Sequence, residues 1–329
     1  MSQTVVLAPS NIAAGQGLSV NDQVAPDSLT QMLQGIISEF PSSIPDPHSE
    51  SQRPDARVNE IILERLHKWG HSADNIPYKK ALDTGVFIAT AAYHHTPPEV
   101  QAEIALYTYI VTIIDDNRVD ATALQQYVPR LCTGSTQLHP VLGWLADVCN
   151  KLGEHYPVFG SYTAFSGSVD FISSELHMRD GKTNLPENLR QLSIPHLKYL
   201  REQTGISRAF GAFIWPKVEF PEAIEYIQAL PDTSELIYSL NDVLSYYKER
   251  KEGETSILIL GLATASSITE LEEIRELVNR LHSLFANIRE VLGTGKARDA
   301  WECFLVGYFR FHLADPRYRL AEILPDLRD

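Results

Sequence analysis

Apolar side chains recur at intervals of three and four residues along most of the chain. In the clearest case, an apolar stripe runs from Val58 to Trp69 between Asp55, a candidate N-cap, and Gly70, a candidate stop. Few segments alternate with a period of two, so the pattern predicts a single all-α bundle. The same periodicity predicts further helices over residues 27–39, 78–93, 98–115, 139–154, 160–178, 194–214, 233–251, 267–291 and 297–313.

Two stretches near the start lack this periodicity. Residues 1–24 are rich in Ser, Asn, Gln and Gly, and residues 41–54 form a Pro- and Ser-rich connector. We therefore expect a flexible segment over residues 1–54 that holds one short helix, followed by one α-domain over residues 55–329. No repeat of fixed period occurs, which argues against a helical solenoid.

The charge balance is acidic, with 28 Lys and Arg against 42 Asp and Glu and a formal net charge of −14. Because no long basic run is present to neutralise phosphates, nucleic acid is not expected as a partner. The three cysteines form no Cys-x-x-Cys pair and the first residues do not read as a signal peptide, so we expect a reducing, cytoplasmic setting.

Several other classes of protein are excluded by what the sequence lacks. No G-x-G-x-x-G, G-x-x-x-x-G-K-[S/T] or G-x-S-x-G motif occurs where a strand would enter a helix, which excludes nucleotide-binding folds and α/β-hydrolases. The most apolar window, residues 257–265, is too short for a membrane span of roughly 20 residues. We therefore expect no membrane span.

Two adjacent acids stand where a helix should end. Asp115 and Asp116 follow the apolar run of residues 98–114, at the terminus where the helix dipole places partial negative charge. Thr108 and Val111 share a face with Asp115, which predicts that this carboxylate points into the bundle. A hard cation would then resolve the electrostatic conflict; the alternative is a solvated acidic pair that begins a loop.

A second polar group lies on a later predicted helix. Asn241, Ser245 and Glu249 are spaced by four residues, so their side chains stack on one face and offer three oxygen ligands. Oxygen donors suit Mg²⁺, whereas zinc would favour His or Cys. Lys248 lies near the same face, where it could contact a phosphate bound by the metal. The alternative is an exposed polar face with an incidental spacing.

Two more segments complete a set of four motifs. L-R-x-x-x-G occupies residues 200–205 and is followed by Trp-Pro-Lys at 215–217, while H-L-A-D-P-R-Y at residues 312–318 ends in an Arg-Tyr pair. Residues 241–249 read N-D-x-x-S-x-x-K-E. In order and approximate interval, these motifs and the acidic pair resemble the class I terpenoid cyclases, most closely the fungal trichodiene synthase family, over about residues 58–320.

The resemblance implies one helical bundle around a central active-site cavity, with three Mg²⁺ ions bound at its rim. Asp115 would hold two of these ions. Asn241, Ser245 and Glu249 would chelate the third from the opposite helix.

The acidic segment departs from the family pattern at one place. A third aspartate often stands four residues after the first, but here that place is Val119, so the following Asp120 is left out of the metal set. By resemblance, Asp116 would orient a cation or pair with the terminal arginine rather than bind metal.

The same resemblance implies a diphosphate site beside the metal ions. Arg201, Lys248, Arg317 and Tyr318 would donate hydrogen bonds to the diphosphate oxygens. Gly205 lies one helical turn after Arg201 and would permit a local break, so diphosphate binding could pull backbone groups toward the substrate.

A carbocation formed by loss of diphosphate needs a dry cavity lined by aromatic rings. The first candidates are Tyr308 and Phe311, which are three residues apart shortly before the Arg-Tyr pair. Weaker candidates are Phe87, Tyr93 and Tyr109. The alternative for each ring is ordinary core packing.

The implied activity is Mg²⁺-dependent ionisation of farnesyl diphosphate and cyclisation to a sesquiterpene. Geranyl diphosphate is the alternative substrate. Homodimerisation is suggested by the resemblance alone. A chain-elongating prenyl synthase is the first alternative, but it should carry a second D-D-x-x-D motif where this chain has Asn-Asp-Val-Leu-Ser. A cyclase initiated by protonation would need D-x-D-D, which is absent. A non-catalytic helical scaffold with the same fold is the remaining alternative.

Overall fold

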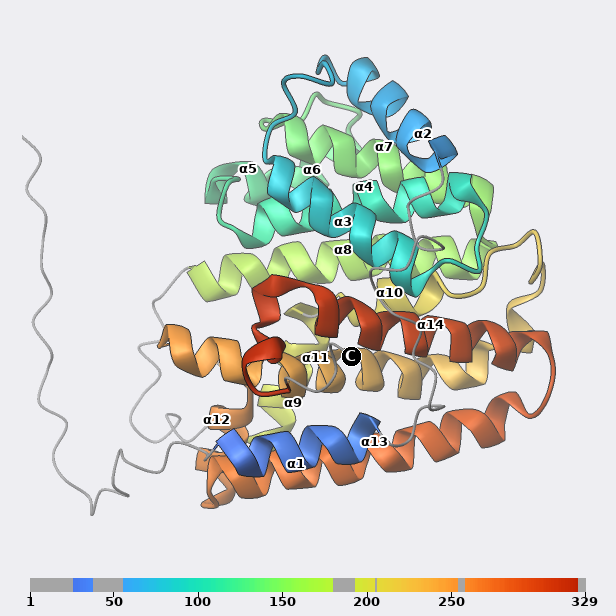
Figure 1. The fold of residues 1–329 in the computed structure, drawn as a ribbon. Coiled ribbons are helices and arrows are strands. Elements are labelled where there is room, and N and C mark those ends of the chain that lie inside the picture. Colours follow the sequence, from blue (N-terminus) through green and yellow to red (C-terminus); the bar gives the residue numbers. More distant parts are fainter. Residues whose placement is uncertain (1–25, 38–55, 180–192, 205, 254–257, 325–329) are drawn as a thin grey trace, which may run out of the picture.

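The described part of the chain is built from helices. The computed structural model describes residues 26–37, 56–179, 193–204, 206–253 and 258–324, and no strand occurs within these ranges. The predicted all-α fold is therefore confirmed (Figure 1). The α-helices are α1 Pro26–Ile37, α2 Ala56–Lys68, α3 Lys79–Ala92, α4 Pro98–Asp115, α5 Ala121–Gln125, α6 Tyr127–Cys132, α7 Pro140–His155, α8 Val158–Arg179, α9 Ile194–Thr204, α10 Ser207–Ala212, α11 Leu230–Glu252, α12 Leu258–Ser266, α13 Glu270–Leu292 and α14 Lys296–Ala314. The short 3-10 helices are η3 Ala223–Glu225, η4 Ile227–Ala229, η5 Pro316–Tyr318 and η6 Leu320–Glu322.

The observed helices differ from the predicted ones in two respects. The helix predicted over residues 194–214 is divided into α9 and α10, and Ile206 between them adopts a left-handed conformation with φ of 48°. The short helices α5, α6 and α12 were not predicted, because five to nine residues hold too few turns to show a clear period. Gly70 does end α2, with a positive φ of 88° that favours glycine.

The core of the bundle is organised around α4. Residues 100–114 of this helix are buried apart from Thr112, because α4 packs against α3, α2 and α7. On the other side of α3 lies α14, while α11 packs against α10 and α13 (Figure 1). The carboxyl end of α4, the middle of α11 and the segment after α14 hold the candidate site residues.

The helix expected within residues 1–54 is α1, which lies along α13 (Figure 1). Its Leu29 is buried, so this helix shares the hydrophobic core despite its distance along the chain. None of the described helices combines the length and apolarity that crossing a bilayer requires.

Close contact between α14 and α3 depends on a glycine. A Cβ atom on Gly307 would overlap the Ala91 carbonyl group and lie 2.7 Å from the Ala92 Cα atom. Because these are backbone atoms, the two helices would have to move apart to accept any side chain. We expect Gly307→Ala to lower the free energy of unfolding by about 2–3 kcal/mol, as measured by urea denaturation.

Gly143 on α7 provides a matched control, because a Cβ atom there would meet nothing within 4 Å. Gly143→Ala should be neutral or stabilise the protein by up to about 1 kcal/mol, since alanine favours the helix. Equal effects of the two substitutions would contradict the close-contact explanation.

Candidate active site

The first candidate ligand lies at the carboxyl end of α4. Asp115 is the last residue of this helix and Asp116 follows as its C-cap. Thr108 and Val111, on the same face, are buried, whereas Asp115 is accessible to solvent. The helix face that these three residues share is therefore buried at Thr108 and Val111 but exposed at Asp115. The carboxylate lies at the rim of the bundle and not, as the sequence had predicted, inside it.

Arg179, at the end of α8, satisfies this helix terminus. Its Nη1 donates to the Val119 carbonyl at 2.6 Å, and its Nη2 donates to the Ile114 carbonyl and to Glu175 Oε2, the latter at 2.9 Å. A cation at the carboxyl end of a helix is favourable. Arg179 was not among the residues predicted to be functional. Its four-residue spacing from Glu175 indicated an ion pair but not the distant carbonyl groups that it binds.

Charged groups from three other elements act on the Asp115 carboxylate. Burial among protein atoms raises the pKa of Asp115, although the side chain keeps contact with solvent. The positive charges of Arg317, Arg201 and Lys248 lower this pKa, and the negative charge of Asp116 raises it further. Electrostatic interactions of this kind fall off with distance and screening. The structure therefore brings the acidic end of α4 close to basic residues from α9, α11 and η5.

The polar stripe predicted on α11 is present. Asn241 and Glu249 are partly exposed, and Ser245 between them is buried. The Ser245 Oγ atom has no hydrogen-bond partner among the described residues, which is unusual for a buried hydroxyl. Lys248 is also buried, with its Nζ 3.8 Å from Glu252. An oxygen left without a partner between two other oxygen donors fits a site that would hold a hard cation.

Arg201 reaches from α9 to the start of this stripe. Its Nε lies 2.8 and 3.0 Å from the two oxygens of Asp242, and its Nη2 donates to Asn241 Oδ1 at 3.0 Å. Burial raises the pKa of Asp242, and Arg201 opposes the rise. Asp242 had been given no role from the sequence beyond its place in the motif. Gly205, the candidate effector, lies outside the described residues.

The Arg-Tyr pair lies on η5, directly after α14. Burial lowers the pKa of Arg317, but Tyr318, Asp115 and Asp116 together raise it above its ordinary value. Burial raises the pKa of Tyr318 to about 12, against the effects of Arg317 and of a hydrogen bond from Asn241. The pair thus lies between the end of α4 and the stripe of α11, beside candidate residues from both.

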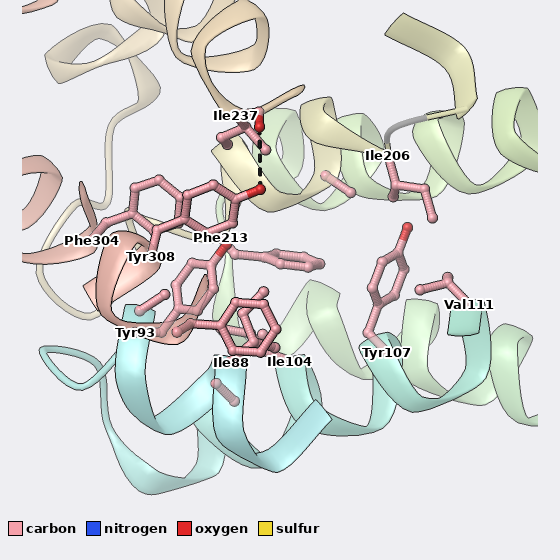
Figure 2. Close-up of a cluster of buried hydrophobic side chains, with 14 of the residues drawn as sticks. Ile88, Tyr93, Ile104, Tyr107, Val111, Ile206, Phe213, Ile237, Phe304 and Tyr308 are labelled. Atoms are coloured by element: carbon pink, nitrogen blue, oxygen red, sulfur yellow. Dashed lines mark hydrogen bonds between the residues drawn. The ribbon is translucent and has the colours of Figure 1, made fainter. Parts of the chain in front are cut away.

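Three of the candidate cavity aromatics lie near this pair or beneath it. Phe87 packs edge-on against Phe311 with ring centroids 5.4 Å apart, and Phe311 packs against Tyr318 at 5.8 Å. Tyr308 is buried and its hydroxyl donates to the Ile237 carbonyl at 3.2 Å, as Figure 2 shows. The packed rings of Phe87, Phe311 and Tyr318 thus connect α3, α14 and η5, and Tyr308 contacts this group through the ring of His312.

The other two aromatic candidates are placed differently. Tyr109 stacks on Trp144 of α7, and its hydroxyl donates to the Pro77 carbonyl at 2.7 Å, so it faces α7 rather than α14. Tyr93 is fully buried with Phe304 in the cluster of Figure 2, and its hydroxyl donates to the Phe210 carbonyl at 2.8 Å. Both positions are explained by core packing.

The assembled residues can bind a polyanion together with cations. Arg201, Lys248 and Arg317 supply positive charge, and Asp115 of α4 and Glu249 of α11 supply negative charge, with Glu249 acting electrostatically on Arg201. No group of three His, Cys, Asp or Glu side chains suited to a metal ion occurs in the described residues. The candidate set relies instead on amide and hydroxyl oxygens, which are ligands for Mg²⁺ rather than for zinc.

Comparison with known proteins gives consistent matches. The family model described as Trichodiene synthase (TRI5) matches residues 77–328. Over 300 residues the chain is 31% identical to Monoterpene synthase 25 of Postia placenta, covering 90% of this chain and 88% of that protein. It is 28% identical over 278 residues to Alpha-cuprenene synthase COP6 of Coprinopsis cinerea, covering 83% and 84% of the two chains.

A solved structure supports the fold independently. The linalool/nerolidol synthase from Streptomyces clavuligerus superposes with a TM-score of 0.57 over 83% of this chain and all of its own, at 16% sequence identity. At that identity the likeness concerns the fold alone.

Proposed function

This chain belongs to the trichodiene synthase family and is a terpene cyclase, a lyase acting on a prenyl diphosphate, and from that premise we propose that it ionises farnesyl diphosphate with Mg²⁺ and cyclises the carbocation to a sesquiterpene. One observation carries the proposal. Arg201 of α9 donates to Asn241 Oδ1 of α11 at 3.0 Å, one helical turn from the unpartnered Ser245 hydroxyl, which supports a diphosphate donor beside two metal ligands.

We assign the metal ligands to Asp115 on one side and to Asn241, Ser245 and Glu249 on the other, with three Mg²⁺ ions in all. The unpartnered Ser245 hydroxyl supports this assignment, because a buried oxygen without a hydrogen bond is costly unless another group binds it. When bound, Mg²⁺ supplies Lewis-acid stabilisation of the charge that develops on the departing diphosphate.

Arg201, Lys248, Arg317 and Tyr318 bind the diphosphate in this proposal. Guanidinium groups form forked hydrogen bonds to phosphate oxygens, and these bonds strengthen as charge accumulates on the leaving group. Asp116 then pairs with Arg317, on which it already acts. The role of Gly205 as an effector that follows Arg201 remains part of the proposal.

Phe87, Tyr308 and Phe311 form the surface over which the carbocation folds. Their faces can stabilise positive charge, and a layer of packed rings excludes the water that would quench it. Tyr109 is left out of this set, because its ring stacks on Trp144 and its hydroxyl binds the Pro77 carbonyl.

The test is incubation of the purified protein with farnesyl diphosphate and Mg²⁺, with and without EDTA, followed by analysis of volatile products in a pentane extract. We expect a cyclic C15 product that EDTA abolishes and added Mg²⁺ restores. In a parallel incubation that also contains isopentenyl diphosphate as the five-carbon donor, a longer linear diphosphate in the aqueous phase would indicate a chain-elongating synthase instead. No product in either incubation would favour a non-catalytic scaffold.

Geranyl diphosphate is the second candidate substrate, because a relative that is 31% identical is named as a monoterpene synthase. Parallel incubations at equal concentration decide between the two substrates through the ratio of kcat/KM. Cytoplasmic localisation and homodimerisation stay predictions from the sequence.

A further inference from the structure

His312 lies at the centre of the candidate site but belongs to neither ligand set. It occupies the last turn of α14 and is fully buried. Its Nδ1 lies 2.8 Å from the Tyr308 carbonyl oxygen, and its Nε2 lies 3.2 Å from Asn241 Nδ2. The imidazole therefore connects the backbone of α14 to the first residue of the polar stripe on α11.

The hydrogen-bond partners of His312 determine which nitrogen carries the proton. A carbonyl oxygen can only accept, so Nδ1 must be the donor to Tyr308. In the tautomer with its proton on Nδ1, the Nε2 atom carries a lone pair and acts as an acceptor. The group that faces Nε2 is consequently the amide nitrogen of Asn241.

The opposite side of the Asn241 amide requires the same orientation. The guanidinium of Arg201 can only donate, so the atom that it contacts must be Oδ1. The orientation of this amide thus follows from Arg201 and His312, because Tyr318, which also receives a hydrogen bond from Asn241, could equally donate one. An isolated asparagine side chain can be rotated by 180° with little change in shape. A flipped amide would place Nδ2 against Arg201 and Oδ1 against the lone pair of His312.

We propose that His312 is a positioning residue that keeps Oδ1, rather than Nδ2, of Asn241 turned toward the metal site. The inference rests on the proposed function, in which Asn241 Oδ1 is a Mg²⁺ ligand and Arg201 turns to the diphosphate. Once Arg201 has turned away, His312 still holds the amide in the orientation that presents an oxygen to the cation. Substitution of a residue that orients a metal ligand commonly lowers the metal affinity by about 10- to 100-fold.

The test compares His312→Phe, which keeps an aromatic ring but removes the acceptor, with His312→Gln, whose side-chain oxygen can reach the place of Nε2. The readout without turnover is the rise in melting temperature on titration with Mg²⁺ in the presence of inorganic diphosphate. We expect His312→Phe to need about tenfold more Mg²⁺ for half the full rise, and His312→Gln to need no more than about threefold more. The same shift should appear in the Mg²⁺ dependence of diphosphate release.

A double-mutant cycle separates orientation from general destabilisation. In the Asn241→Asp background the two side-chain oxygens are equivalent, so rotation no longer exchanges a ligand for a non-ligand. There His312→Phe should cause no further increase in the Mg²⁺ requirement. An increase as large as that in the Asn241 background would overturn the inference, and this comparison needs no assumption about the stability of either variant.

His95 offers a matched control, because it is a partly buried histidine whose Nε2 lies 3.0 Å from the Ile214 carbonyl, away from the candidate ligands. His95→Phe should leave the Mg²⁺ requirement unchanged. If His312→Phe responds to Mg²⁺ and diphosphate like the unmodified protein, the inference is wrong while the proposed function stands. If the unmodified protein neither responds to Mg²⁺ with diphosphate nor turns over, the proposed function itself fails.

Discussion

Glu249→Gln is expected to reduce diphosphate release from farnesyl diphosphate by about 10²- to 10³-fold. The substitution keeps the shape of the side chain and removes the only formal charge among the three ligands of the polar stripe on α11. Mg²⁺ binds a carboxylate far more strongly than a neutral amide, so the Mg²⁺ concentration for half-maximal rate should also rise. Steady-state release of diphosphate over a Mg²⁺ titration measures both effects.

Glu252→Gln is the matched control for this prediction. Glu252 is the last residue of the same helix, is exposed, and lies three residues after Glu249. Its neutralisation should change the rate by less than about threefold, because the half-exposed Glu252 carboxylate lies 3.8 Å from Lys248, which is long for an ion pair. If Glu249→Gln retained nearly full rate at low Mg²⁺, the ligand assignment on α11 would have to be abandoned.

Arg65→Met is expected to lower the free energy of unfolding by about 3–5 kcal/mol without touching the candidate site. Arg65 of α2 is buried against the Glu103 carboxylate of α4, and its Nη2 lies 2.8 Å from Asp147 Oδ2 of α7. The other oxygen of Glu103 is buried without a hydrogen-bond partner among the described residues. Removing the arginine would therefore leave a buried charge uncompensated, which urea denaturation should detect as a lower midpoint.

The decrease in the free energy of unfolding caused by Arg65→Met should depend on pH. Burial raises the pKa of Glu103 above its ordinary value of 4.5, and Arg65 opposes that rise, so the variant should raise the pKa further. A carboxyl with a raised folded-state pKa contributes most to stability below its unfolded pKa, and this contribution is lost as the pH rises through the folded pKa. The variant should consequently be more destabilised at about pH 8 than at about pH 5.

Arg57→Met tests the role of burial on the same helix. Arg57 also contacts two carboxylates, those of Glu60 at 3.3 Å and Glu99 at 3.8 Å, but its side chain is half exposed. Exposed pairs of this kind contribute about 0–1 kcal/mol. A comparable loss for both variants would refute the view that desolvation makes Arg65 important.

The long helices could be predicted because their apolar stripes are local. From Val58 to Trp69 the apolar side chains recur once per helix turn. The end of the helix at Gly70 requires only the positive φ that glycine adopts easily. The alignment of Asn241, Ser245 and Glu249 on one face is local in the same sense, because three residues four apart must stack wherever α11 lies. The division between α9 and α10 was not predicted as a helix boundary, since the apolar pattern continues through it, although Gly205 indicated where a local break is permitted.

By itself, the sequence determined an all-helical chain, the polar stripe on α11 and the acidic pair at the end of α4. Only the tertiary structure decided that Arg179 would bind carbonyl groups at and beyond the end of α4, that Tyr109 would stack on Trp144, and that His312 would contact the Asn241 amide. The physical reason is that periodicity reports which face of a helix is apolar but not which distant helix covers it. Contacts such as that between His312 and Asn241, 71 residues apart, arise only when packing brings the helices together.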